Sequence, residues 1–105
     1  MPKTTATKTI EMDEDTMMVF YDGRWSRPTL REWKFIRMLV NARGSTVTVD
    51  EMVDAFWAKS KNKQRSGNAR GLADAVRDKI GEDLVKLDYR RGYYTEARLV
   101  RKAAR

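Results

Sequence analysis

Polar and charged side chains fall on the outward faces of the segment 69–80, in which apolar residues recur at helical spacing. These side chains are Asn68, Arg70, Asp74 and Arg77. An arginine binds phosphate oxygens and the acceptor edge of guanine, and a carboxylate accepts from the amino group of cytosine. Together on one helix, they predict base contacts to duplex DNA with the helix lying in the major groove.

A second basic group lies in the segment 84–95, where residues 84–87 and 93–95 are expected to form the two short strands of a hairpin. Arg90 and Arg91 lie in the turn between them. A hairpin beside such a helix reaches phosphates or the adjacent minor groove, and two arginines at its tip suit that contact. The alternative is a helix and a hairpin that only pack together, with their charges in solvent.

The segment between residues 59 and 70 contains basic residues and no acid. Its basic side chains are Lys59, Lys61, Lys63, Arg65 and Arg70. Residues 59–68 are polar, contain serine and glycine, and are expected to form a loop. Because the whole chain carries a net charge of +7, we expect these side chains to bind DNA phosphates and release counterions. A loop whose charges are simply solvated is the alternative.

The composition limits the chemistry that the chain can perform. Its 105 residues are enough for one domain with a modest core, and both cysteine and histidine are absent from the sequence. Thiol nucleophiles, disulfides, imidazole catalysis and the common zinc sites are therefore excluded. We expect no catalytic residue, no cofactor and no metal. The sequence has no 18-residue apolar run and no signal-peptide core, which predicts a cytoplasmic protein without membrane contact.

The N-terminal part of the chain has the pattern of a small antiparallel sheet. Residues 9–12 and 17–21 are expected to be strands. Asp22-Gly23 is typical of a two-residue hairpin turn, and residues 24–27 return from it.

Two helices are expected between this sheet and the segment at residue 69. The first covers residues 30–42, with Thr29 as the first residue of a capping box. Residues 46–49 are short, β-branched and extended, and a second helix over residues 51–59 begins at Asp50 as its N-cap. The chain is thus predicted to be of the α+β class.

One domain over residues 9–96 accounts for all these elements. Residues 1–8 are small and polar and are expected to form a disordered N-terminal tail. Residues 97–105 are expected to form a basic C-terminal tail without a role in the core.

The order of the elements and four local matches resemble the OmpR/PhoB-type winged-helix DNA-binding domain. The matching segments are DG with PTLREW (22–33), GSTVTVDEMVDAFW (44–57), VRDKIG (76–81) and VKL with RGY (85–93). The resemblance implies a winged helix-turn-helix with an N-terminal antiparallel sheet, three helices and a C-terminal β-hairpin wing. Residues 69–80 would be its recognition helix, the helix after Asp50 its supporting helix, and residues 84–95 its wing.

The resemblance also orders the candidate contacts. Arg77 falls on a basic position that contacts DNA in relatives and is the first candidate. Trp57 falls on a tryptophan that relatives pack where the protein meets the DNA backbone, so its indole N–H is expected to donate to a phosphate. A Trp57 that serves only the core is the alternative.

Three departures from the family pattern put the usual sequence preference in doubt. Asp74 stands where relatives often place basic residues. The wing lacks one glycine, which displaces Arg90 and Arg91. Gly71 lies inside the recognition helix, where a glycine costs about 1 kcal/mol against alanine.

The resemblance implies a sequence-specific double-stranded DNA-binding transcriptional regulator that is not an enzyme. No receiver domain fits before Ile10, so a stand-alone domain is expected, as in small regulators encoded by phages or mobile elements. Two alternatives stay open: a protein-interaction module that binds RNA polymerase or another regulator, and a non-specific architectural DNA-binding protein. A dimer, formed only on DNA or through the N-terminal sheet, is open as well.

Overall fold

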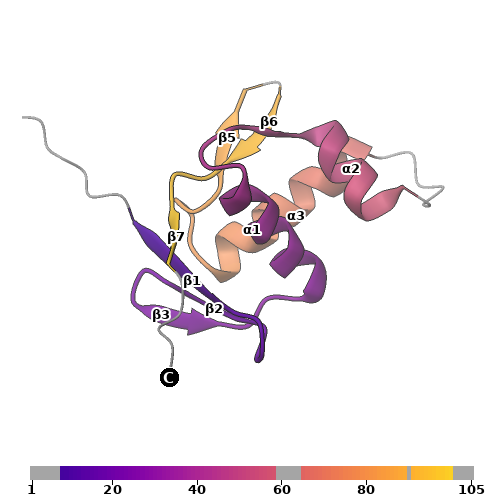
Figure 1. Ribbon diagram of the computed structural model, residues 1–105. Coiled ribbons are helices and arrows are strands. Elements are labelled where there is room, and N and C mark those ends of the chain that lie inside the picture. Colours follow the sequence, from indigo (N-terminus) through magenta and orange to yellow (C-terminus); the bar gives the residue numbers. More distant parts are fainter. Residues whose placement is uncertain (1–7, 59–64, 90, 101–105) are drawn as a thin grey trace, which may run out of the picture.

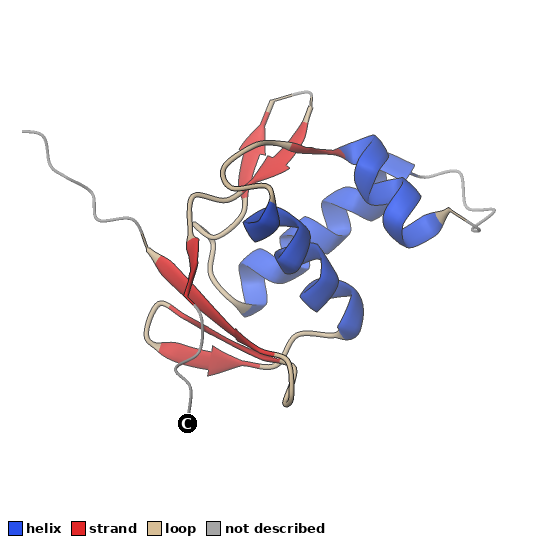
Figure 2. Cartoon of the chain, viewed as in Figure 1, coloured by secondary structure: helices blue, strands red, loops and turns tan. Residues whose placement is uncertain are grey.

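The computed structural model describes residues 8–58, 65–89 and 91–100, which form three helices and two β-sheets (Figure 1). The helices are α1 (Leu30–Asn41), α2 (Val49–Trp57) and α3 (Arg65–Lys79). The strands are β1 (Thr9–Asp13), β2 (Met18–Tyr21), β3 (Arg24–Ser26), β4 (Val47–Thr48), β5 (Lys86–Asp88), β6 (Gly92–Tyr94) and β7 (Arg98–Val100). The helices lie together on one side of the sheet that contains β1, and the β5–β6 hairpin projects away from that sheet (Figure 2).

The first sheet has the strand order β3-β2-β1-β7, and its first three strands form the predicted antiparallel meander. Asp22 and Gly23 connect β2 to β3 with left-handed φ angles of 54° and 86°. Two consecutive left-handed residues make the tight turn that matches the twist of a hairpin, which confirms the predicted turn.

The fourth strand of this sheet corrects the prediction of a basic tail from residue 97. Arg98–Val100 form β7, which runs parallel to β1 and pairs Leu99 with Ile10. The Arg98 N–H also donates to the Lys8 carbonyl oxygen at 2.9 Å. A three-residue strand has no readable period in the sequence, and its partner lies almost ninety residues away. Only the folded chain brings β1 to this segment.

Two capping boxes set the starts of α1 and α2. Thr29 and Glu32 form the predicted box at α1. At α2 the N-cap is Thr48, paired with Glu51, and not Asp50 as predicted. The Thr48–Glu51 pair has the three-residue spacing that satisfies two backbone N–H groups at once, whereas Asp50 lies in the first turn and favours the helix through its charge. The extended segment before α2 is accordingly only the two residues of β4.

The other two boundary corrections concern α3 and the wing. α3 begins at Arg65, so residues 65–68, predicted as loop, are helical. Its apolar stripe begins only at Ala69, because the first turn extends beyond the core. Leu84 and Val85, predicted as strand, are buried in the turn after α3, and β5 begins at Lys86. Apolar residues in a buried turn and in a strand give the same signal in a sequence.

The core lies between α1, α3 and the inner face of the β1–β2 hairpin. Its fully buried members include Ile10, Val19, Phe35, Ile36, Leu39, Ala73, Val76 and Leu84. Among the residues that the structure describes, none of the helices is both long and apolar enough to cross a membrane.

Gly92 is the position at which the second sheet, of order β4-β6-β5, requires a glycine. A Cβ atom there would overlap the Val47 carbonyl oxygen and lie 2.7 Å from the Thr48 Cα. The backbones of β4 and β6 therefore approach each other only because residue 92 has no side chain. This pairing ties the wing to the start of α2.

Candidate nucleic-acid interface

One face of α3 is exposed along its length. The buried side of the helix carries Ala69, Leu72, Ala73 and Val76, which pack into the core. The exposed side carries Gly67, Arg70, Gly71, Asp74 and Asp78. The predicted helix and its outward residues are thus brought together on one surface.

Asp74 lies between the two arginines of this surface. Its Oδ1 atom accepts from an Nη atom of Arg77 at 3.2 Å, and its Oδ2 atom lies 3.8 Å from the Arg70 Nε. Arg77 also donates from Nε to the Val85 carbonyl oxygen at 3.0 Å. Arg77 therefore connects α3 to the turn that leads into the wing, while its side chain is only 28% exposed. The Arg70 side chain, by contrast, is 80% exposed.

Carboxylates surround Arg77. Asp74, Asp78 and Glu82 line a shallow surface hollow together with Arg77. Three negative charges beside one positive charge make this end of α3 unfavourable for a phosphate group.

The wing packs against the same region of α3. Tyr93 of β6 is buried and meets Phe35 of α1 edge-on, with ring centroids 6.3 Å apart. Burial raises the pKa of the Tyr93 phenol, and the nearby positive charge of Arg77 partly opposes that rise. Tyr93 thus packs the wing against α1 and lies within electrostatic range of Arg77 on α3.

The turn of the wing is fixed by hydrogen bonds. The Arg91 N–H donates to the Asp88 carbonyl oxygen at 2.9 Å, and the Arg91 carbonyl oxygen accepts from the Val49 N–H at 3.1 Å. The Thr46 hydroxyl donates to the Asp88 carboxylate. The Arg91 side chain is exposed at this turn, as the sequence predicts. Arg90 lies outside the described residues.

Trp57 is half-buried at the end of α2 and does not lie on the exposed face of α3. Its ring meets Phe56 edge-on at 5.9 Å. The Arg31 guanidinium of α1 stands over the ring at 4.9 Å, a cation–π contact that neither residue's sequence position predicts. A donor role of the indole toward phosphate stays a prediction.

Of the remaining predicted DNA contacts, the structure describes the side chain of one and not those of the others. Asn68 lies in α3 beside the exposed face and is half-buried. Lys59, Lys61 and Lys63 lie outside the described residues, as does the side chain of Arg65. Their phosphate contacts stay predictions.

The C-terminal end of α3 is held by the first sheet, through residues that sequence analysis missed. Arg24 and Ser26 of β3 donate to the Lys79 carbonyl oxygen, at 2.9 and 3.4 Å. The Lys79 ammonium in turn donates to Glu32 at 2.8 Å. Burial opposes the ionisation of Glu32, but hydrogen bonds from Lys79 and Thr29 outweigh it, and the pKa of Glu32 is lowered. A cation at a helix C-terminus is favourable because the last carbonyl groups carry partial negative charge.

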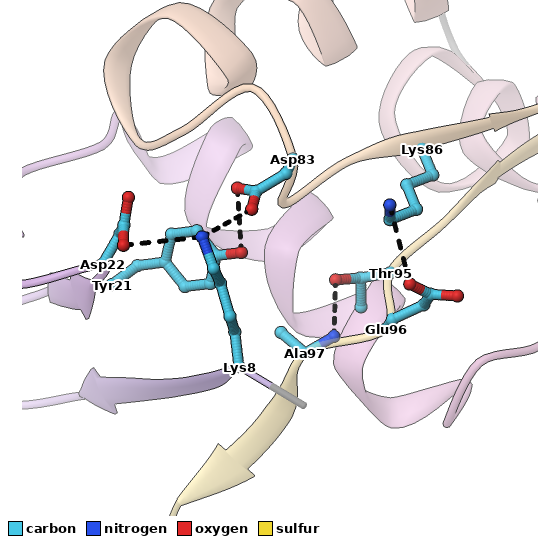
Figure 3. Close-up of polar contacts among 8 residues, drawn as sticks. All are labelled: Lys8, Tyr21, Asp22, Asp83, Lys86, Thr95, Glu96 and Ala97. Carbon is cyan, nitrogen blue, oxygen red and sulfur yellow. Dashed lines mark hydrogen bonds and ion pairs between the residues drawn. The ribbon is translucent and has the colours of Figure 1, made fainter. Parts of the chain in front are cut away.

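A second set of contacts holds the turn that follows α3 (Figure 3). Lys8 bridges Asp83, at 2.6 Å, and Asp22, at 3.5 Å. The Tyr21 hydroxyl donates to the other oxygen of Asp83 at 3.0 Å. A Cβ atom at Gly81 would lie 3.0 Å from the Tyr21 ring, so the ring packs directly on this turn. No local pattern could reveal the two contacts of Asp83, because Tyr21 and Lys8 lie 62 and 75 residues away from it in the chain.

A broad surface hollow lies away from the exposed face of α3. It is lined by β7, by the C-terminal half of α1 and by side chains of both charges, among them Arg37, Glu96 and Arg98. No described residue of α3 lines it.

No family model matches the chain, and no curated protein matches it. Solved structures do. The chain is similar to the DNA-binding domain of Bacillus subtilis CssR, with a TM-score of 0.70, 18% identity, and coverage of 83% of this chain and 99% of that one. It is also similar to the DNA-binding domain of the response regulator AdeR in complex with an intercistronic region, with a TM-score of 0.69, 22% identity and coverage of 89% and 99%.

A third similar structure is the C-terminal domain of the nisin resistance regulator NsrR, a lantibiotic response regulator. Its TM-score is 0.63 at 15% identity, with 88% of this chain and 93% of that chain covered. At such low identities, the structural similarity establishes the fold alone. The solved structures agree with the three helices, the two sheets and the projecting hairpin described above. The chain therefore has the winged-helix fold of the response-regulator DNA-binding domains, as its sequence predicted.

Proposed function

We propose that this protein is a sequence-specific double-stranded DNA-binding transcriptional regulator that acts without catalysis. In this proposal α3 enters the major groove and the β5–β6 wing contacts the backbone or the adjacent minor groove. The observation that carries it is the exposed face of α3 together with the hydrogen bond from Arg77 to the Val85 carbonyl oxygen, which holds α3 to the turn that leads into β5. The similarity in fold to a domain solved on DNA supports it.

Electrostatics support the same orientation. The first turn of α3 contains no acid, and the partial positive charge of a helix N-terminus attracts phosphate. Lys59, Lys61, Lys63 and Arg65 belong to the proposed phosphate contacts, together with Arg91 of the wing. Binding should then weaken steeply as salt rises, because each neutralised phosphate releases counterions. With DNA as the ligand, a cytoplasmic location is part of the proposal.

The test is the selection of bound duplexes from a random DNA library, carried out with the full chain at about 50 mM and about 200 mM salt, the range in which phosphate-dominated binding falls. We expect an enriched motif that survives the higher salt. Its half-site spacing would report one protomer or a pair on the DNA. Binding without a motif would contradict a specific regulator and leave an architectural protein, and no binding at either salt would leave a protein partner such as RNA polymerase.

A further inference from the structure

We infer that the two arginines on α3 have different tasks, and that the one favoured by sequence resemblance is not the one that recognises a base. Arg70 recognises a guanine in the major groove, with Asp74 orienting it. Arg77 is a positioning residue that holds Asp74 and the turn before the wing. This inference rests on the proposed function and names the base and the residue that would give it specificity.

Two of the five N–H donors of Arg77 are engaged within the chain, one on each side of its guanidinium. A guanidinium recognises guanine with two N–H groups from one edge, which reach the O6 and N7 atoms together. Arg77 uses Nε for the Val85 carbonyl oxygen and an Nη for Asp74. Each edge that could form such a fork therefore contains a nitrogen that is already donating. Its 28% exposure agrees with this internal role.

The charges around Arg77 oppose contact with DNA phosphates as well. Asp74, Asp78 and Glu82 line the hollow that contains it. A DNA strand that approached this end of α3 would bring its phosphates toward three carboxylates. The region of α3 that can come closest to a duplex is consequently the part nearer its N-terminus.

Arg70 has the opposite surroundings. Its side chain is 80% exposed, and the Asp74 carboxylate lies 3.8 Å from Nε, an ion pair longer than a hydrogen bond. Gly67 and Gly71 lie beside it on the exposed face. A Cβ atom at Gly71 would meet no atom of the described chain within 4 Å. The helix therefore presents a low surface from which Arg70 is the long side chain that projects.

Asp74 gives this arrangement its specificity. A carboxylate beside the guanidinium restricts the conformations of Arg70, which lowers the entropy lost when the fork forms. The same carboxylate repels phosphate, so it disfavours binding modes in which Arg70 contacts only the backbone. Asp74 thus lowers the overall affinity for DNA and makes binding depend more strongly on the base that Arg70 contacts.

The experiment compares variants that keep the charge of each arginine and remove its fork. Binding of the full chain is measured to the selected duplex, to the same duplex with each guanine replaced by adenine, and to a duplex of unrelated sequence. For Arg70→Lys we expect the preference for one guanine to fall by at least about 10-fold, with affinity for the unrelated duplex little changed. For Arg77→Lys we expect weaker binding to all duplexes by a similar factor, a lower melting temperature, and an unchanged preference for guanine.

A matched pair of neutral variants tests the role of Asp74. Asp74→Asn and Asp78→Asn each remove one negative charge from the same helix, so both should strengthen binding to the unrelated duplex. Only Asp74→Asn should reduce the preference for guanine. Replacing the identified guanine by 7-deazaguanine, which lacks the N7 acceptor, should weaken binding of the unmodified protein and leave Arg70→Lys nearly unaffected.

The outcomes separate this inference from the proposed function. A motif whose guanine preference is lost in Arg77→Lys and kept in Arg70→Lys would overturn the inference and leave a specific regulator. A motif that contains no preferred guanine would do the same. If selection with the unmodified protein finds no base preference at all, both the inference and the proposed function fail.

Discussion

The two ends of α3 differ in what surrounds them. The C-terminal end, which we call the anchored end, consists of Lys79 and the turn at Gly81–Asp83, held by β2, β3 and Glu32. The half nearer the N-terminus, which we call the presented face, carries Gly67, Arg70 and Gly71 in solvent. One end of the helix is held by contacts with the first sheet and with α1, and the other is exposed to solvent.

The comparison explains what the first sheet contributes. None of its residues needs to lie on the exposed face of α3, yet Arg24 and Ser26 determine where the helix ends. A side chain placed by packed secondary structure is held more accurately than one on a loop. The described contacts of β3 therefore influence the exposed face through the position of α3.

The largest expected effect comes from breaking the wing beside the presented face. Gly92→Ala would force a methyl group against the Val47 carbonyl oxygen and the Thr48 Cα, so β6 must separate from β4. We expect the free energy of unfolding to fall by about 3 kcal/mol, the upper end of the usual range for overpacking, because the clash is with backbone atoms. Urea unfolding followed by tryptophan fluorescence measures it. An unchanged midpoint would show that β4 and β6 do not pair this closely.

A smaller effect is expected from Glu32→Gln at the anchored end. The variant keeps an acceptor for the Thr29 N–H but loses the charge that pairs with Lys79. We expect a loss of about 1–3 kcal/mol at pH 7, because one partner of a largely buried ion pair is removed. Equilibrium unfolding at several pH values is the measurement.

The lowered pKa of Glu32 determines how its contribution to stability changes with pH. The pKa of Glu32 in the folded protein is lowered from its ordinary value of 4.5. The stability that it contributes is therefore present above pH 4.5 and is lost as the pH falls through the folded pKa. Glu32→Gln should make unfolding less sensitive to acid in that range. An equally steep acid dependence in the variant would assign it to other carboxylates.

A still smaller loss of stability is expected from Arg24→Ala. The change removes the guanidinium that donates to the Lys79 carbonyl oxygen at the end of α3. Because this contact is exposed, we expect a loss of only about 1 kcal/mol in unfolding free energy. Arg27→Ala is the matched control, since Arg27 is an exposed arginine just beyond β3. Equal melting temperatures for the two variants would argue against the anchored end.

The smallest expected effect has the opposite sign. Gly71→Ala places a methyl group in open space on the presented face, where alanine favours the helix by about 1 kcal/mol over glycine. Stability should rise by up to that amount, while specific DNA binding weakens because the added methyl group separates α3 from the duplex. Thermal unfolding and DNA binding are measured on the same preparation. A stabilised variant with unchanged binding would place Gly71 outside the contact.

The order of the elements up to β6 and the start of α1 were predictable from the sequence. The apolar stripe of α3, the Asp22-Gly23 turn and the capping box at Thr29 each depend on residues close together in the chain. The site could be predicted only in part. The pattern places Arg70, Asp74 and Arg77 on one helix, but it does not say which arginine is engaged inside the protein.

Only the tertiary structure decided which of the two arginines is engaged inside the protein. The acceptor of the Arg77 Nε is a carbonyl oxygen in a turn, and a backbone acceptor leaves no trace in the residue types of a sequence. The same reason accounts for β7, whose partner is β1, and for the cap that Arg24 provides to Lys79. Local spacing determines which helices and turns form, because their hydrogen bonds close within a few residues. Contacts between distant residues depend on how those elements pack, and they set which side chains remain exposed for a ligand.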